Sequence, residues 1–194
     1  MLGFKDSAVA TSGLKYIKEL LLGKRTDHAF RMVVVGDPNI NLGEIGMPRH
    51  IAEKLLVSEH VNRWNFGKLK DYVALILVGG GEICVRRGGR LEKLSIIDKL
   101  CCGDVLYRPM LDGDIVLINR PPSIHQHSML SLSVRILPIN SVLSINPLIC
   151  SPLRGDFDGD CLHGYVSQSV DSRVELNELV ALNKQLLNGQ SGRN

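Results

Sequence analysis

Long apolar runs and aromatic side chains are both scarce in this 194-residue sequence, where Phe, Tyr and Trp make up only 5%. A helix that crosses a bilayer needs about 20 mostly apolar residues, and no stretch of the chain approaches this length. The first residues also lack the charged and then apolar pattern of a secretory signal. We therefore expect no membrane as a partner of this protein.

Cysteines are few and irregularly spaced. The chain has five, at positions 84, 101, 102, 150 and 161, and none belongs to a C-x-x-C pair. Zinc sites and disulfide frameworks are recognised by such paired spacings. We expect neither, and we expect a reducing compartment.

A strong charge of either sign is also absent, because 23 Lys and Arg face 20 Asp and Glu and leave a net charge of only +3. Contacts with nucleic acid would therefore have to come from local basic clusters rather than from a global field. Hydrophobic residues make up 44% of the chain, which suffices for the core of one or two domains.

The most unusual stretch is residues 154–160, Arg-Gly-Asp-Phe-Asp-Gly-Asp. Its three carboxylates are Asp156, Asp158 and Asp160. Two like charges about 4 Å apart repel by roughly 1 kcal/mol in water and by roughly 4 kcal/mol at an effective dielectric near 20. A folded domain that gathers three of them needs a cation or wide exposure, and hard oxygen ligands select Mg²⁺, Ca²⁺ or Mn²⁺.

A straight strand could not bring these carboxylates to one ion, because the outer two would lie about 13 Å apart on one face. The segment must curl, and Gly159 is the residue that allows it. Phe157 would then point into the core and anchor the loop. The apolar residues on both sides of the loop favour a buried site.

Two other interpretations compete with this one. A calcium EF-hand also begins D-x-D-x-D, but its sixth position must be Gly and its twelfth Glu. Counted from Asp156, these positions hold Cys161 and Ser167, so the EF-hand pattern fails. The second alternative is a plain acidic turn in solvent, which the apolar flanks argue against.

Other motifs, in a fixed order, connect the loop with a known family. Residues 23–31 contain G-K-R-T-D followed by Arg31, and residues 36–39 read G-D-P-N. Residues 113–125 read G-D-I-V-L-I-N-R-P-P-S-I-H, and residues 134–138 read V-R-I-L-P. With D-F-D-G-D, these blocks resemble the largest subunit of multisubunit DNA-dependent RNA polymerases. The residues that flank the loop most resemble the plant nuclear RNA polymerase IV branch, with polymerase V as the rival.

We expect a β-rich α+β fold, and the resemblance implies a double-psi β-barrel-type active-site domain with helical insertions. The expected parts are an N-terminal segment with a short helix (1–23), a catalytic barrel domain with an insertion at about 48–100 (24–169), and a C-terminal helix with a cut end (170–194). Largest subunits are far longer than this chain. The resemblance therefore implies a fragment of one or a truncated gene product.

The activity that the resemblance implies is nucleotidyl transfer with two Mg²⁺ ions, building RNA on a DNA template. Asp156, Asp158 and Asp160 would hold the first ion, and the second would arrive with the nucleotide. The implied partners are the second-largest polymerase subunit and other polymerase subunits, the DNA template, the RNA product and nucleoside triphosphates. The implied setting is RNA-directed DNA methylation and small-RNA production in the plant nucleus.

The resemblance also gives roles to four basic residues. Lys24, Arg25 and Arg31 would face the template strand and the RNA–DNA hybrid, where phosphate contacts hold register without reading sequence. Arg120 resembles the arginine that contacts the ribose of the incoming nucleotide. Arg154 is a departure from the family, and its charge beside the loop could either weaken metal binding or bind a phosphate. Without the resemblance, the cluster at 24–31 and Arg120 would be read as ordinary surface charges.

Two departures from the family pattern fall next to the acidic loop. Arg154-Gly155 stands where the family usually has Asn-Ala, and Pro121 stands where it has Gln after N-R. The family's asparagine helps to sense the ribose 2′-hydroxyl, so a slow or less accurate polymerase is expected. The alternative is a truncated, non-catalytic remnant that acts only as an assembly or nucleic-acid-binding module.

Hydrophobic patterns predict the remaining elements. Helices are expected at residues 14–22, after Pro48, at 66–77 and at 170–179, and strands at 32–35, 83–85, 105–107, 115–118, 134–137 and 142–145. Asp112-Gly113 is expected to be a turn and not a second metal site. We expect Trp64 to be a packing anchor rather than a base-stacking platform, and His125 and His127 to be structural.

Overall fold

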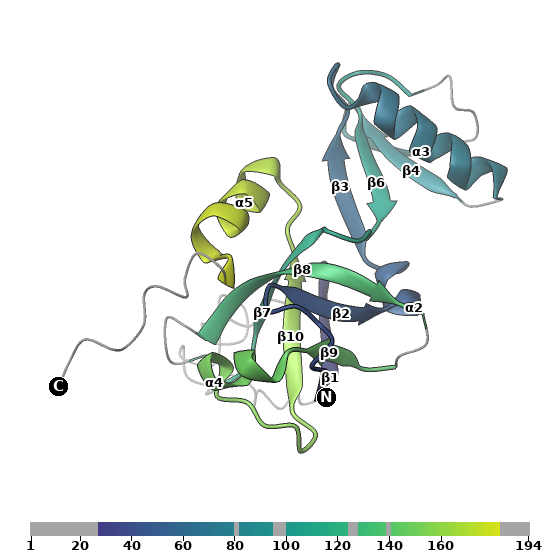
Figure 1. The fold of residues 1–194 in the computed structure, drawn as a ribbon. Coiled ribbons are helices and arrows are strands. Elements are labelled where there is room, and N and C mark those ends of the chain that lie inside the picture. The colour runs from purple at the N-terminus through teal and green to yellow at the C-terminus, as the bar shows by residue number, and fades with distance from the viewer. Residues whose placement is uncertain (1–26, 80–81, 95–99, 124–127, 139–140, 183–194) are drawn as a thin grey trace, which may run out of the picture.

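The computed structural model describes residues 27–79, 82–94, 100–123, 128–138 and 141–182. Its main body is a closed barrel with the strand order β1-β10-β7-β8-β2-β9 (Figure 1). The strands are β1 (Ala29–Gly36), β2 (Glu44–Pro48), β7 (Ile115–Asn119), β8 (Met129–Leu137), β9 (Leu143–Ile145) and β10 (Cys161–Val166). The prediction of a β-rich α+β fold is confirmed.

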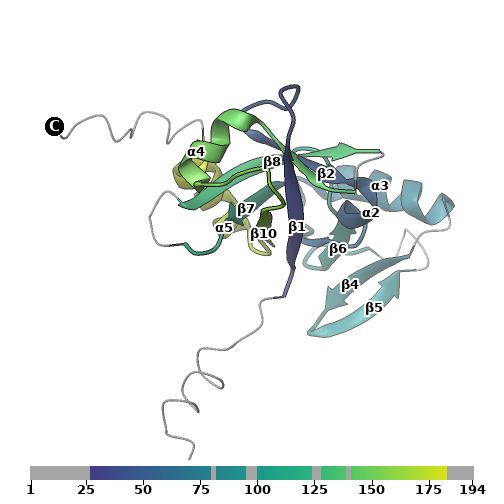
Figure 2. The ribbon, with the colours of Figure 1, turned by 90° about the horizontal axis from the view of Figure 1, so that it is seen from below.

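The barrel is mixed rather than purely antiparallel. β2 runs parallel to β8, and β1 runs parallel to β9, whereas the other neighbouring strands are antiparallel. β1 crosses the barrel beside β10, as Figure 2 shows from below. Strands distant in sequence therefore meet, and β10 brings the end of the acidic loop next to β1 and β7.

Alternating side chains explain how the barrel strands form. In β10, the even-numbered positions 162, 164 and 166 are buried and the positions between them are partly exposed. This period of two is what a strand with one face on a core requires. The buried Val34, Val116, Ile118, Leu132 and Ile145 belong to one hydrophobic cluster inside the barrel.

A second, smaller sheet has the order β3-β6-β4-β5. Its strands are β3 (Leu56–His60), β6 (Val105–Pro109), β4 (Ile83–Arg87) and β5 (Arg90–Leu94), and the helix α3 (Phe66–Val78) packs on it (Figure 1). Leu69 and Val73 of α3 join Ile83, Val85 and Leu106 in a separate core. We call residues 56–109 the small sheet subdomain.

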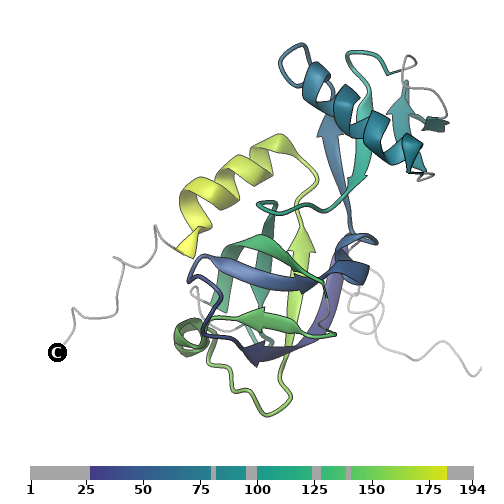
Figure 3. The same cartoon turned by 45° about the vertical axis from the view of Figure 1, so that its right-hand side comes forward.

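Ion pairs and hydrogen bonds connect this subdomain with the barrel side of the molecule. Arg108 at the end of β6 is almost fully buried, donates to both carboxylate oxygens of Asp114 at 2.7 and 2.9 Å, and pairs with Glu59 at 2.6 Å. Gln168, just after β10, donates through Nε2 to the Leu56 carbonyl at 2.9 Å. The helix α5 (Val170–Glu175) follows, continued by a π-helical turn (Leu176–Val180) (Figure 3).

The strands predicted on either side of residues 111–114 are confirmed as β6 and β7, which belong to different sheets. The helix expected after Pro48 is present as the short α2 (Arg49–Ala52), with Pro48 as its N-cap. Trp64 is 96% exposed, so it is not a packing anchor.

The predicted turn at Asp112 is consistent with the structure. Gly113 has a φ of +87°, and Asp112 accepts a hydrogen bond from the Ile136 amide. The predicted helix at 14–22 lies outside the described residues, as do Lys24, Arg25, His125 and His127. No helix in the described part of the chain is long and apolar enough to cross a membrane.

Candidate active site

The acidic loop, residues 154–160, joins α4 (Cys150–Leu153) to β10 and protrudes from one end of the barrel (Figure 1). α4 ends because Arg154 takes a left-handed conformation, with a φ of +49°. The amides of Arg154 and Gly155 donate to the carbonyls of Ser151 and Cys150, each at 3.1 Å. The helix end therefore fixes where the loop begins.

The curl predicted at Gly159 is confirmed. Gly159 has a φ of +115°, which side chains of L-residues rarely adopt. The Asp156 amide donates to Asp160 Oδ2 across the loop at 2.8 Å, and the Asp160 carbonyl accepts from the Val34 amide of β1 at 3.0 Å. Both ends of the loop are thus tied, one to α4 and one to β1.

Two predictions about the environment of the loop were wrong. The flanking Ile149, Leu153 and Leu162 are buried, but Asp156 and Asp158 are exposed. Phe157 is 38% exposed and does not enter the core. Its ring lies against Gly36 instead, where an added Cβ would come within 2.9 Å of it. The loop is anchored on the barrel wall and open to solvent.

Arg120 holds Asp160 by two hydrogen bonds, from Nε to Oδ2 at 2.6 Å and from a terminal nitrogen to Oδ1 at 3.2 Å. Strand pairing accounts for this meeting, because Asn119 at the end of β7 lies opposite His163 of β10. The residue after Asn119 therefore reaches the residues just before β10.

The Arg120 guanidinium, and then the Asp156 amide, hold the pKa of Asp160 below its usual value. The same ion pair raises the pKa of Arg120, and the charges of Asp158 and Asp156 add to this effect. Burial, followed by the charges of Asp156 and Asp160, raises the pKa of the neighbouring Cys150 thiol. The three aspartates therefore concentrate negative charge at the loop, and the Arg120 guanidinium is paired with one of them.

The donor atoms of the loop suit Mg²⁺, because carboxylate oxygens are what this ion prefers. In this structure, however, the three carboxylates are not arranged around one common point. Asp160 is turned to Arg120, Asp156 Oδ1 accepts from the Phe157 amide at 2.7 Å, and among the described residues no three His, Cys, Asp or Glu gather as metal ligands. An ion at this loop would have to share the Asp160 carboxylate with Arg120.

The other predicted site residues lie as follows. Arg154 is exposed at the start of the loop. Arg31 is exposed on β1, opposite His163 of β10. The structure therefore pairs Arg120 with Asp160, within reach of the charges of Asp156 and Asp158, and leaves Arg31 on the outer face of the barrel.

Reasoning from sequence missed Gly36 and Cys150 as neighbours of the loop. The glycine of G-D-P-N provided a signal, since a position without a Cβ often marks a close approach. No pattern in the sequence connected it with Phe157, however, because the two residues meet only once β1 and the loop are folded. Cys150 gave no signal beyond its proximity in sequence.

Comparison with known proteins gives one family and several relatives. Residues 23–182 match the family RNA polymerase Rpb1, domain 2. The chain is 57% identical over 190 residues to DNA-directed RNA polymerase IV subunit 1 of Arabidopsis thaliana, covering 98% of this chain and 13% of that protein. It is 35% identical over 192 residues to DNA-directed RNA polymerase V subunit 1 of the same plant, covering 97% and 10%.

An archaeal relative is more distant. DNA-directed RNA polymerase subunit Rpo1N of Methanothermobacter thermautotrophicus is 33% identical over 180 residues, covering 89% of this chain and 21% of that protein. The chain thus spans about a tenth to a fifth of the length of these relatives. The closed, mixed barrel of six strands agrees with the double-psi β-barrel that the resemblance implied.

Proposed function

This chain belongs to the family of RNA polymerase largest subunits, and on that premise we propose that its barrel is the active-site domain of a DNA-directed RNA polymerase of the plant polymerase IV type. The reaction would be nucleotidyl transfer, building RNA on a DNA template. The observation that carries the proposal is the acidic loop, whose three aspartates lie within five residues of chain at one end of the barrel and whose Asp160 is paired with Arg120.

Asp156, Asp158 and Asp160 would hold a Mg²⁺ ion in this proposal. When bound, such an ion lowers the pKa of an attacking hydroxyl and neutralises charge on the transferred phosphoryl group. Exposure of Asp156 and Asp158 leaves the loop open to an ion and a nucleotide from solvent. The anchoring of Phe157 on Gly36 and of the Asp160 carbonyl on Val34 limits how far the carboxylates can move.

The arginines would bind and orient the nucleotide. Arg120 already donates hydrogen bonds to Asp160 of the loop, and its planar guanidinium group can also donate to a ribose hydroxyl or a phosphate. Arg154 adds an exposed positive charge at the start of the loop. Lys24, Arg25 and Arg31 would contact backbone phosphates of the template and of the hybrid.

The wider setting follows from the relatives. The chain is most similar, among those compared above, to a polymerase IV subunit. The proposed partners are a second-largest subunit and other polymerase subunits, together with DNA, RNA and nucleoside triphosphates. The proposed location is the plant nucleus, with a role in RNA-directed DNA methylation and small-RNA production.

Arg154 and Pro121 would make this enzyme slow or less accurate. Asparagine tolerates the left-handed conformation that Arg154 adopts, and its amide can pair with a ribose hydroxyl, which a guanidinium replaces with charge. Reversion by Arg154→Asn and Pro121→Gln in the assembled enzyme should raise the elongation rate or the fidelity. If neither rate nor fidelity changes, these residues do not limit the enzyme.

A second candidate is a non-catalytic remnant that serves only for assembly or nucleic-acid binding. The bidentate pairing of Arg120 with Asp160 favours it, because this pairing competes with an ion for the same carboxylate. The two candidates differ in whether the loop takes up a metal ion in the assembled polymerase.

Fe²⁺-directed hydroxyl-radical cleavage separates the two candidates. With this chain assembled with its second-largest subunit, cuts should cluster near residues 156–160 and disappear in the Asp156→Ala/Asp158→Ala/Asp160→Ala variant. An Asp112→Asn variant is the matched control, since its carboxylate caps the Ile136 amide far along the chain from the loop, and it should keep the cuts. A well-assembled complex without cuts would support the remnant.

A further inference from the structure

Trp64 is the only tryptophan of the chain, and 96% of its side chain is exposed. A tight set of hydrogen bonds fixes the loop that carries it. Asn62 Oδ1 accepts from the Trp64 and Asn65 amides at 3.0 and 2.9 Å, Asn65 Oδ1 accepts from the Asn62 amide at 2.8 Å, and Asn65 Nδ2 donates to the His60 carbonyl at 2.8 Å. The backbone thus holds a large aromatic ring out into water.

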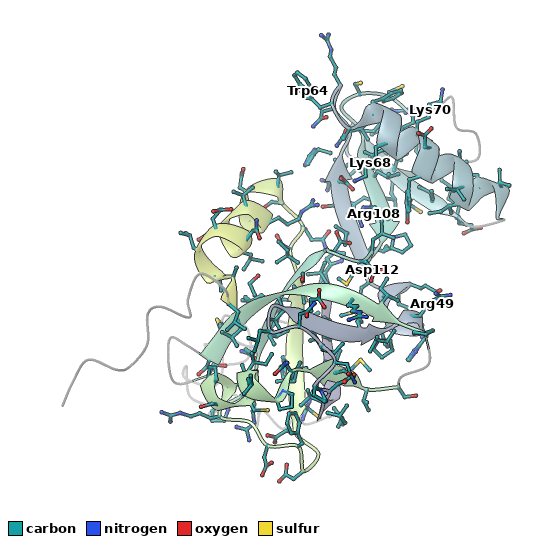
Figure 4. All side chains as sticks on the ribbon, in the orientation of Figure 1. Arg49, Trp64, Lys68, Lys70, Arg108 and Asp112 are labelled. Atoms are coloured by element: carbon teal, nitrogen blue, oxygen red, sulfur yellow. The ribbon has the colours of Figure 1, made fainter. Side chains whose placement is uncertain are left out.

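Lys68 lies on the same side as Trp64. Helical bonding begins before α3 itself, because the Phe66 amide donates to the Asn62 carbonyl at 3.0 Å and the Leu69 amide to the Asn65 carbonyl at 2.9 Å. Residues four apart in such a segment face the same way. Figure 4 shows Trp64 at the outer end of the small sheet subdomain, away from the barrel, with Lys68 on the adjoining helix.

Strand register brings further basic residues to this end of the sheet. His60 at the end of β3 pairs with Val105 of β6, and Val105 pairs with Arg86 of β4. Neighbouring strands lie about 4.8 Å apart, so Arg86 is only about 10 Å from His60 across the sheet. Arg90 follows in the same hairpin. We define the Trp64 surface as the exposed residues Arg63, Trp64, Lys68, Arg86 and Arg90.

The positive charge of the chain is concentrated here. Residues 62–93 carry seven Lys and Arg against three Asp and Glu, a formal net charge of +4, whereas the whole chain carries only +3. Among the described residues, Arg63, Lys68, Arg86 and Arg90 form no ion pair, unlike Arg87, which is bound to Asp104, and Lys93, which is bound to Glu82. Four exposed basic side chains and one exposed aromatic ring therefore lie at the same end of this subdomain, with Arg86 on the face of the sheet opposite α3.

We propose that the Trp64 surface binds single-stranded nucleic acid, with Trp64 stacking on a base and the four basic side chains contacting phosphates. An aromatic ring among basic residues is how proteins bind single strands without sequence preference, and each stacked base contributes about 1–3 kcal/mol. A duplex offers no open base face to such a ring. The charge complementarity favours nucleic acid over a protein that would dock on the exposed Leu75 and Val78 of α3.

This surface is separate from the acidic loop, which protrudes from the barrel at the other end of the molecule (Figure 1). The inference does not rest on catalysis at Asp156–Asp160, because a remnant without activity would bind in the same way. Failure of one proposal therefore leaves the other standing.

The lone tryptophan provides a direct test with the full 194-residue chain. A labelled oligo(dT) of about 12 nucleotides, within the usual range of single-strand site sizes, reports binding anywhere on the chain through its anisotropy. Trp64 fluorescence reports binding at this surface alone. We expect the two signals to change with the same midpoint, with Trp64 quenched by the stacked base.

Variants separate stacking from charge. Trp64→Leu should weaken binding about fivefold or more, since stacking is lost. Lys68→Gln should weaken binding and reduce its salt dependence, because one phosphate contact is removed. Leu75→Ala is the matched control on α3, and it should leave both the affinity and the fluorescence change as they are in the wild type.

Three results would overturn the proposal. Anisotropy that rises while Trp64 fluorescence stays constant would mean that nucleic acid binds elsewhere, and no binding at all would exclude this ligand. A Trp64 signal that responds only to the second-largest subunit would make this surface a protein-docking site.

Discussion

At the scale of single residues, close contacts in the barrel wall depend on glycine. The Phe30 ring of β1 covers Gly164 of β10, where an added Cβ would lie 2.0 Å from the ring. Gly164→Ala must push this ring aside and should lower the free energy of unfolding by about 1–3 kcal/mol, measured by chemical denaturation. Gly67→Ala in α3 meets nothing within 4 Å and should instead stabilise by roughly 0.4–1 kcal/mol. Equal effects of the two substitutions would contradict this packing.

Asp104 makes stability depend on pH. It is buried and bound to Arg87 by two hydrogen bonds at 2.8 and 2.6 Å, and this ion pair lowers its pKa. A carboxylate with a lowered pKa stabilises the fold above its unfolded pKa of about 3.9 and loses this contribution as pH falls through the folded value. Asp104→Asn should therefore be less stable than the wild type at neutral pH, with a difference that narrows in acid. A difference independent of pH would show that the charge of Asp104 is not responsible.

The sequence predicted the backbone conformation of the acidic loop but not the exposure of the aromatic side chains. The curl at Gly159 could be predicted, because three carboxylates on a straight strand are too far apart for one ion. The positions of Phe157 and Trp64 could not, because the exposure of an aromatic ring depends on which surface the rest of the chain offers to it. Phe157 packs on Gly36 at the surface of the barrel and stays partly exposed. Hydrogen bonds to the Asn62 side chain hold the backbone of the loop that exposes Trp64.

At the scale of elements, β6 and the turn before β7 are connected through Arg108. Its guanidinium is buried between Glu59 and Asp114. Asp114→Ala leaves this charge with one carboxylate and should lower the free energy of unfolding by about 3 kcal/mol, measured by denaturant titration. The ion pair of Lys93 with Glu82 has a similar length of 2.6 Å but is exposed, so Glu82→Ala should cost less than about 1 kcal/mol. Similar losses in both variants would show that burial of the pair does not matter.

The elements themselves were largely predictable, but their partners were not. Alternation and β-branched residues predicted β1, β4, β7 and β8, and helical spacing predicted α3. β6 and β7 flank one turn, as predicted, but the sequence did not indicate their partners. β6 pairs with β3 and β4, and β7 pairs with β8 and β10. Local periodicity determines that a segment is a strand, whereas its neighbours depend on contacts across the whole chain.

At the scale of the molecule, the two candidate sites lie at opposite ends. The barrel holds the acidic loop, and the small sheet subdomain carries the Trp64 surface at its far end (Figure 1). Arg108 pairs with Asp114, Gln168 donates to the Leu56 carbonyl, and Arg173 of α5 donates to the Ser58 carbonyl, so side-chain contacts connect the two parts. A protein built in this way can hold a nucleic acid at more than one point.

The central claim is that the loop at residues 156–160 performs nucleotidyl transfer. The most direct measurement is extension of an RNA primer on a DNA template by the assembled polymerase that contains this chain, with Asp158→Asn compared against Asp112→Asn. The account predicts that Asp158→Asn assembles normally but no longer extends the primer, while Asp112→Asn extends it as the wild type does. Extension by the assembled Asp158→Asn enzyme at the wild-type rate would contradict the account.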